Sequence, residues 1–223
     1  MDALKRIPIK FLGELHEVKL INFSVERDEL KGAVPEKIKV RDFNGRAMIS
    51  MVNVKLRNMR PAFVPAFRFN YQHVAFRLLV DDAGYNNGTQ KGIYFLRSFT
   101  NKPLIVWGGS LITEYKLEKA EILDAGYAFR LSKGSKYIRY HIEEKEPEIN
   151  LQLKTTIGAL DRAYSVLGND VRVTQIQREK WPIEPIVCDG FETNFFESAR
   201  LEGAFDVKET IYYQWLPPKK VMS

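Results

Sequence analysis

The sequence has little cysteine and little histidine. One cysteine, Cys188, stands in 223 residues, so no intrachain disulfide can form. The three histidines, His16, His73 and His141, are far apart, and neither a CxxC nor an HxxxH spacing occurs. We therefore expect no metal and no cofactor, and we expect Cys188 to be a small buried side chain rather than a nucleophile.

Long apolar runs are also absent. No segment approaches the roughly 20 consecutive apolar residues that cross a bilayer. Residues 1–13 lack the apolar stretch and the small-residue cleavage site of a signal peptide. These absences lead us to expect a cytoplasmic protein without a membrane partner.

The chain lacks a concentrated patch of positive charge. Its 34 basic and 28 acidic residues leave a formal net charge of +6. The two signs are mixed, as in residues 26–29 and 143–146. No basic block is interleaved with aromatic residues in the manner of an RNA-binding sheet. We therefore expect no nucleic acid among its partners.

What the chain does contain is typical of a globular domain. Apolar residues make up 45% and charged residues 28%. The length suits one domain over residues 1–223, with a sizeable core. Strand-like segments separated by turn signals dominate, and Asn44-Gly45 predicts a tight hairpin. The expected strands cover residues 15–23, 38–42, 47–56, 73–80, 92–98, 117–123, 127–131, 137–142, 171–177, 192–196 and 210–216.

Helical patterns are fewer. A short helix is expected near residues 24–33, and longer ones at 102–112 and 155–167, the last closed by Gly168. The helix at 102–112 is apolar nearly all round, so we expect it to be buried, with Gly108 and Gly109 packed against another backbone. The balance predicts a mainly β fold, an antiparallel curled sheet or barrel with two or three helices.

The most informative segment runs from His73 to Val80 and alternates with period two. Its even-numbered residues form one apolar face that suits a core. Its other face carries His73, Ala75, Arg77 and Leu79. If this second face lines an enclosed cavity, the imidazole and the guanidinium form a place to bind an anion.

These segments, taken in order, resemble the uncharacterised YqjF-like family of bacterial proteins, placed in the acetoacetate decarboxylase-like superfamily. The likeness covers most of the chain. It includes a proline-ended helix at residues 30–35, the block at 73–80, a Gly-x-Tyr-Phe-x-x-Ser stretch at 92–98, the following helix and Trp181-Pro182. The resemblance implies an acetoacetate decarboxylase-like fold.

The block at 73–80 departs from the family's approximate Glu-x-Asn-x-Arg-Thr-Tyr-Val pattern. His73 stands in place of the acid, Ala75 in place of the asparagine, and Leu79 in place of the tyrosine. Arg77 is the one polar member retained. An activity that requires the family's carboxylate is therefore not expected to carry over.

The resemblance also implies candidate catalytic residues. In the decarboxylases, a lysine just after the helix forms a Schiff base with a β-keto acid. Such an amine must lose its proton, although a free lysine has a pKa of about 10.4. Lys116 is the candidate here, with His73 as a proton donor; the decarboxylases' adjacent lysine pair is missing. The alternative is an exposed Lys116, kept protonated by Glu118 and Glu121.

Four residues are candidate ligand-binding residues: Arg77, Arg97, Tyr94 and Trp181. A planar guanidinium such as that of Arg77 matches a carboxylate, although an internal ion pair with Glu121 is the alternative. Arg97 adds to the site only if the strand register places it on the face of Arg77.

Three functions remain open at this point. The first is binding of a small organic acid, such as a keto acid, in a barrel cavity, without established catalysis. The second is a lyase or decarboxylase acting on a β-keto acid through a lysine. The third is a structural or interaction module with a filled core. The sequence also leaves open whether the protein forms a homo-oligomer.

Overall fold

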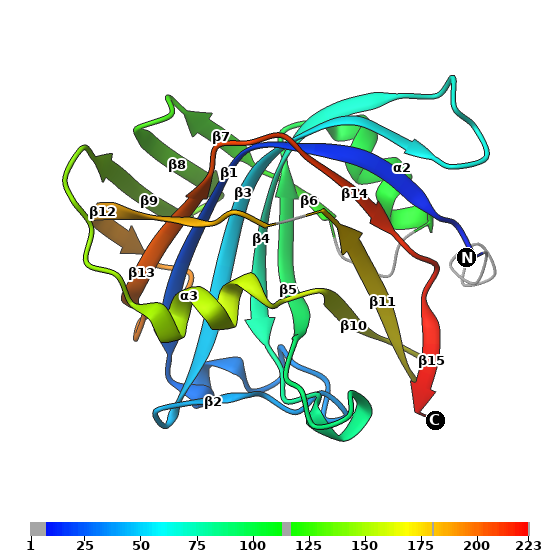
Figure 1. Cartoon of the computed structure of the whole chain (residues 1–223), viewed down its shortest axis with the longest axis horizontal. Coiled ribbons are helices and arrows are strands. Elements are labelled where there is room, and N and C mark those ends of the chain that lie inside the picture. Colours follow the sequence, from blue (N-terminus) through cyan, green and yellow to red (C-terminus); the bar gives the residue numbers. More distant parts are fainter. Residues whose placement is uncertain (1–7, 113–116, 180, 223) are drawn as a thin grey trace.

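The structure, a computed structural model, describes residues 8–112, 117–179 and 181–222, without the side chains of residues 109–112 and 222. Within these ranges, seven strands close into a mixed barrel in the order β1-β3-β4-β5-β10-β11-β14 and back to β1 (Figure 1). Neighbours are antiparallel except β5 and β10. The strands are β1 (Phe11–Val25), β3 (Arg46–Pro61), β4 (Phe69–Leu79), β5 (Gly92–Thr100), β10 (Arg162–Leu167), β11 (Asp170–Arg178) and β14 (Ile211–Trp215).

A second layer continues from β1 through β13, β12, β9, β8 and β7. It includes β7–β9, seen on the left of Figure 1. Short strands β2, β6 and β15 attach to the barrel at β3, β5 and β11. The bounds are β2 (Asp42–Phe43), β6 (Leu117–Lys119), β7 (Glu121–Asp124), β8 (Ala128–Lys133), β9 (Lys136–Glu143), β12 (Glu184–Thr193), β13 (Arg200–Val207) and β15 (Lys219–Met222). The mainly β prediction is confirmed.

One strand belongs to both layers. β1 pairs with β14 through Phe11–Leu15 and with β13 through Val18–Ser24, while β3 runs along its other side. The register with β3 shifts between His16 and Lys19, where Glu17 has φ 51°. An irregularity of this kind increases the local twist and lets one strand change partners.

The alternation predicted for β4 separates two hydrophobic cores. Val74, Phe76 and Leu78 are fully buried between the barrel and the second layer, against Phe129 and Tyr140 among others. Ala75 and Leu79, on the opposite side of β4, belong to a core cluster inside the barrel. We call this second cluster the interior cluster; α3 (Leu151–Gly158) contributes Leu153 and Ile157 to it.

Two glycine turns determine the hairpins. Asn44 and Gly45 have φ values of 50° and 79° between the paired residues Phe43 and Arg46, so the predicted tight hairpin is confirmed. Gly168, with φ 60°, starts the two-residue turn between β10 and β11. It is therefore a hairpin residue and not the end of a helix.

The prediction of a helix at residues 155–167 is wrong in its second half. α3 begins earlier, after Asn150, whose side chain accepts a hydrogen bond of 3.0 Å from the Leu153 amide, and it ends at Gly158. Residues 162–167 form β10 because they pair with β5 on one side and β11 on the other. Pairing between segments distant in the chain overrides weak local helix propensity.

The helix at 102–112 is present as α2 (Pro103–Ile112), but its expected burial is wrong. Leu104 is 82% exposed and Trp107 is 70% exposed, because the main contacts of α2 are with β5 and β6 on one side. A methyl group added at Gly108 would meet nothing within 4 Å, so this glycine is not a close-packing position. No helix in the described ranges is long and apolar enough to span a membrane.

Strand boundaries account for the remaining differences. β3 extends to Pro61, beyond the expected end at residue 56, and β4 begins at Phe69, before the expected start at residue 73. The strand expected at 192–196 is instead the end of β12, which stops at Thr193. β13 and β15 were not expected; β13 lacks strict alternation and contains Gly203, which hides its pairing with β1.

Candidate anion-binding site

Arg77 lies on the side of β4 that faces the barrel interior, between Ala75 and Leu79 of the interior cluster. Its cross-strand partners are Ser50 on β3 and Phe95 on β5. The guanidinium donates from Nε to the Ser50 carbonyl at 3.2 Å and from Nη2 to the Ser50 hydroxyl at 2.8 Å. Two bonds to one residue hold the group, and Nη1 makes no hydrogen bond with any residue that the structure describes.

Arg77 has no acidic partner in the described part of the chain. Glu121, the alternative partner expected from the sequence, is exposed on β7 in the second layer. Burial and the positive charge of Arg178 lower the pKa of Arg77 to about 9. The guanidinium therefore stays protonated at neutral pH, and among the described residues its hydrogen-bond partners are neutral.

His73 shares the interior face, four residues before Arg77. Its ring centroid lies 6.1 Å from that of Tyr71, and Thr100 stands opposite it on β5. Burial, followed by the charge of Arg77, lowers the pKa of His73 to about 4. The imidazole is neutral at neutral pH, and it makes no hydrogen bond within the residues described. It can therefore exchange hydrogen bonds with a guest molecule.

The interior around these groups is partly open and largely aromatic. Tyr71, His73 and Arg77 keep some accessible surface, although Val74, Ala75, Phe76, Leu78 and Leu79 on the same strand are fully buried. Phe95 stacks on Trp215, with centroids 5.8 Å apart, and both pack against the interior cluster. A positive group beside an apolar wall suits a small molecule with one charged end.

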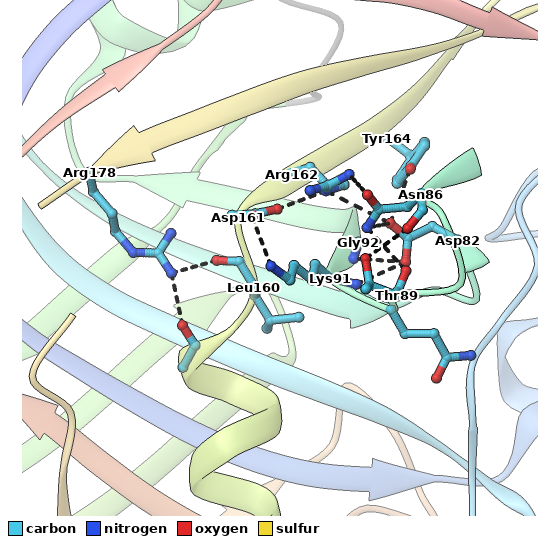
Figure 2. A network of polar contacts seen from close by, with 12 residues as sticks. Asp82, Asn86, Thr89, Lys91, Gly92, Leu160, Asp161, Arg162, Tyr164 and Arg178 are labelled. Carbon is cyan, nitrogen blue, oxygen red and sulfur yellow. Dashed lines mark hydrogen bonds and ion pairs between the residues drawn. The ribbon is translucent and has the colours of Figure 1, made fainter. Parts of the chain in front are cut away.

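Arg178, at the end of β11, is a second interior cation that sequence reasoning missed. Its Nη2 donates to the carbonyls of Gly158 at 3.2 Å and Leu160 at 2.6 Å (Figure 2), and its guanidinium lies 4.6 Å from the Trp181 ring. Burial lowers its pKa to about 10. The sequence held one signal, because Arg178 shares the period-two face of Ile176. The charged residues that follow Arg178 make this segment resemble an exposed, solvated stretch instead.

The structure places Arg97 and Tyr94 away from Arg77. A register shift between Phe76 and Arg77 sets Arg97 opposite Phe76, and Tyr94 opposite Leu78. Arg97 is exposed, 5.5 Å from the Phe195 ring. Arg97 and Arg77 therefore do not share a face of the sheet, so they do not line one cavity. The irregularity reverses the face that simple alternation along β5 would assign to Arg97.

Of the other candidates, Trp181 packs against the interior cluster beneath Arg178. Lys116 lies outside the described residues, so its proposed Schiff-base role stays a prediction. Lys119 is exposed on β6, and Glu118 pairs with Lys133 at 3.3 Å. No cluster of three or more potential metal ligands occurs among the described histidine, cysteine and acidic residues.

A buried carboxylate secures the strands beside the site. Asp82 accepts hydrogen bonds from the amides of Lys91 at 2.9 Å and Gly92 at 3.1 Å, and from the Tyr164 hydroxyl at 3.1 Å (Figure 2). The Asn86 side chain adds a longer contact of 3.4 Å. These bonds tie the β4–β5 loop to β10, where the parallel pair forms. The network is structural, because its members satisfy one another.

A cleft of about 420 Å³ lies on the wall that includes β1, β11 and β14. Its charged lining is balanced, with Glu14 and Glu179 against Arg60 and Arg178. The rest of its lining consists of Leu12, Gly13, Gln177, Tyr212, Tyr213 and Gln214. This balance gives the cleft no preference for an anion.

Comparison with other proteins agrees with the fold. The model of the DUF2071 family, described as an uncharacterized conserved protein, matches residues 13–215. No curated protein matches this chain in sequence.

Several solved structures share the architecture. An acetoacetate decarboxylase-like enzyme from Sphingomonas wittichii RW1 has a TM-score of 0.66 at 10% identity, covering 99% of this chain and 95% of its own. Acetoacetate decarboxylase from Legionella pneumophila has a TM-score of 0.63 at 13% identity, covering 97% and 87%. The enduracididine biosynthesis enzyme MppR, complexed with pyruvate, has a TM-score of 0.59 at 11% identity, covering 96% and 90%.

These identities are low, so the likeness concerns the fold. It agrees with the closed barrel and with the resemblance found in the sequence. The chain belongs to the DUF2071 family and has an acetoacetate decarboxylase-like fold.

Proposed function

We propose that this protein binds a small organic acid inside its barrel, with the carboxylate held by Arg77. The observation that carries the proposal is an interior guanidinium bonded to Ser50 alone, without an acidic partner in the described ranges. A charge removed from water needs compensation, and a bound carboxylate supplies it through paired hydrogen bonds.

The other groups on the same face suit a keto acid. The neutral imidazole of His73 can donate a hydrogen bond to a carbonyl oxygen, and Phe95 and Trp215 offer apolar contact to a short carbon chain. The similar fold of MppR, which was solved with pyruvate, supports the choice of a 2-oxo acid as the first probe.

The test is calorimetric titration of the full chain with pyruvate and 2-oxopentanoate. We expect Arg77→Met to weaken binding by at least tenfold, because it removes the only charged contact in the proposal. Arg130→Met is the matched control: Arg130 is an exposed arginine on β8 that bonds Ser132 at 3.2 Å and lies 5.8 Å from the Tyr137 ring. Equal affinities for wild type and Arg77→Met would refute the proposal.

The same samples separate binding from covalent chemistry. After incubation with a keto acid and borohydride, mass spectrometry reports any reduced Schiff base. An adduct on Lys116 would assign the protein to lyase-type enzymes. Binding without an adduct leaves it as a binding protein for organic acids.

A further inference from the structure

Arg178 faces the same interior as Arg77. It stands opposite Tyr213 on β14, and cross-strand partners share a face of the sheet. Tyr213 is buried in the interior cluster. The alternation of β11 gives the same result, because Ile176, two residues earlier, also packs against that cluster. The side chain of Arg178 therefore starts from the inner side of the wall.

A continuous set of contacts joins the two arginines. Arg77 stands opposite Phe95, and Phe95 stacks on Trp215 at 5.8 Å between centroids. Trp215 stands opposite Ile176, two residues before Arg178. The aromatic pair of Phe95 and Trp215 therefore lies between the strand positions of Arg77 and Arg178.

Arg178 also lacks an acidic partner among the described residues. Both of its hydrogen bonds come from Nη2, so Nε and Nη1 make none within the described ranges. Asp161, the nearby carboxylate, is occupied elsewhere: it accepts from Arg162 at 2.7 Å and lies 3.9 Å from the Lys91 ammonium (Figure 2). Trp181 and the two carbonyls hold Arg178 in place. Glu14 and Glu179 line the same cleft as Arg178, but neither forms an ion pair with it among the described residues.

We propose that the natural guest is a dicarboxylic acid, with one carboxylate at Arg77 and the other at Arg178. This inference rests on the function proposed above and adds the second charged end. A monoanion would compensate one of the two cations, whereas a dianion compensates both and removes their mutual repulsion. The aromatic surface between the cations would contact the carbon chain of the guest.

The separate anchoring of the two guanidinium groups on different elements favours two separate carboxylates over one compact dianion such as phosphate. In the barrel, β5 and β10 lie between β4 and β11. Neighbouring strands are about 4.8 Å apart, so the two backbones are on the order of 10–15 Å apart along the curved wall. Arg77 is held by Ser50 on β3, whereas Arg178 is held by the carbonyls of Gly158 and Leu160 at the end of α3 and after it. The two charges therefore have separate anchors, which suits a guest with two separate carboxylates.

The experiment compares 2-oxopentanoate with 2-oxoglutarate, which have the same five-carbon chain and differ in a methyl or carboxylate end. In calorimetry with the full chain, we expect wild type to bind 2-oxoglutarate at least tenfold more tightly. Arg178→Met should reduce this preference to about twofold, with the affinity for 2-oxopentanoate within about threefold of wild type. Arg77→Met should weaken both acids, and Arg130→Met should change neither.

The outcomes distinguish the two proposals. If wild type binds neither acid, the proposed function fails. If wild type binds both acids equally, or if Arg178→Met weakens both equally, the dicarboxylate inference is wrong and acid binding stands.

Because Arg178 supports the end of α3, its substitution could prevent folding. A second test therefore uses the wild-type protein alone. The 5-methyl ester of 2-oxoglutarate should bind like 2-oxopentanoate, and binding as tight as the diacid would overturn the inference.

Discussion

Ser50 holds Arg77 from the neighbouring strand with both its carbonyl and its hydroxyl, at 3.2 and 2.8 Å. In this pair Ser50 is neutral and Arg77 carries the positive charge. Ser50 is fully buried, so the contact is shielded from bulk water. The serine therefore positions the guanidinium without cancelling the charge that a carboxylate would need.

Substitution of this serine tests its positioning role. In Ser50→Ala, Arg77 keeps the carbonyl contact and loses the hydroxyl contact. A hydrogen bond to a charged group contributes roughly 1.5–3 kcal/mol, so we expect 2-oxopentanoate to bind about 10–150-fold more weakly in calorimetry. Ser132→Ala, which removes the hydroxyl partner of exposed Arg130, is the control and should have no effect. Unchanged affinity in Ser50→Ala would contradict the positioning role.

Arg77 is expected to cost stability in the ligand-free protein. Replacing buried ionic groups by well-packed apolar side chains of similar volume is often neutral or stabilises a fold by about 1–4 kcal/mol. We expect the free energy of unfolding of ligand-free Arg77→Met to be at least about 1 kcal/mol higher than that of wild type, even though the contacts with Ser50 are lost. For a chain of this size that corresponds to a rise of about 2–4 °C in Tm, measured by calorimetry. A lower Tm would show that the guanidinium is a net structural contributor.

His73 makes stability depend on pH. Its pKa is about 4 in the folded protein against 6.5 ordinarily, so between these values the unfolded chain binds a proton that the folded chain does not. The stability that depends on neutral His73 is therefore fully present above about pH 6.5, and it is lost as the pH falls toward 4. A shift of this size corresponds to roughly 3 kcal/mol.

The measurement is urea unfolding of wild type and His73→Gln from pH 7 to pH 4. Wild type should lose about 2–3 kcal/mol more than His73→Gln over this range, because glutamine does not titrate. The carboxylates are common to both proteins, so their contribution cancels in the difference. Parallel curves would mean that His73 is readily protonated in the folded barrel.

Two glycine substitutions should have opposite effects. A methyl group at Gly92 would stand 2.6 Å from Tyr164 Cε2, 2.7 Å from Val80 Cγ2 and 2.9 Å from Asp82 Cγ, all in buried residues. We expect Gly92→Ala to lower the free energy of unfolding by about 2–3 kcal/mol in urea titrations. Gly108→Ala in α2, where nothing lies within 4 Å, should raise it by about 0.5–1 kcal/mol. Similar values for both variants would contradict the tight packing around Gly92.

Properties local to one segment could be predicted without coordinates. The alternation in β4 separated Arg77 and His73 from Phe76 and Leu78, because successive side chains on a strand point to opposite faces. The tight turn at Asn44-Gly45 followed from residues that tolerate positive φ. The mainly β fold followed from the number and spacing of such segments.

Properties that depend on pairing between distant segments could not be predicted from the sequence. One irregularity in the β4–β5 register moved Arg97 to the outer side and left Phe95 opposite Arg77. Arg178 joined the interior through the pairing of β11 with β14, although it lies about a hundred residues after Arg77. A period-two pattern specifies the two faces of each strand, but strand register and barrel closure arise from contacts across the whole chain. Those contacts decided which charged residues share the interior.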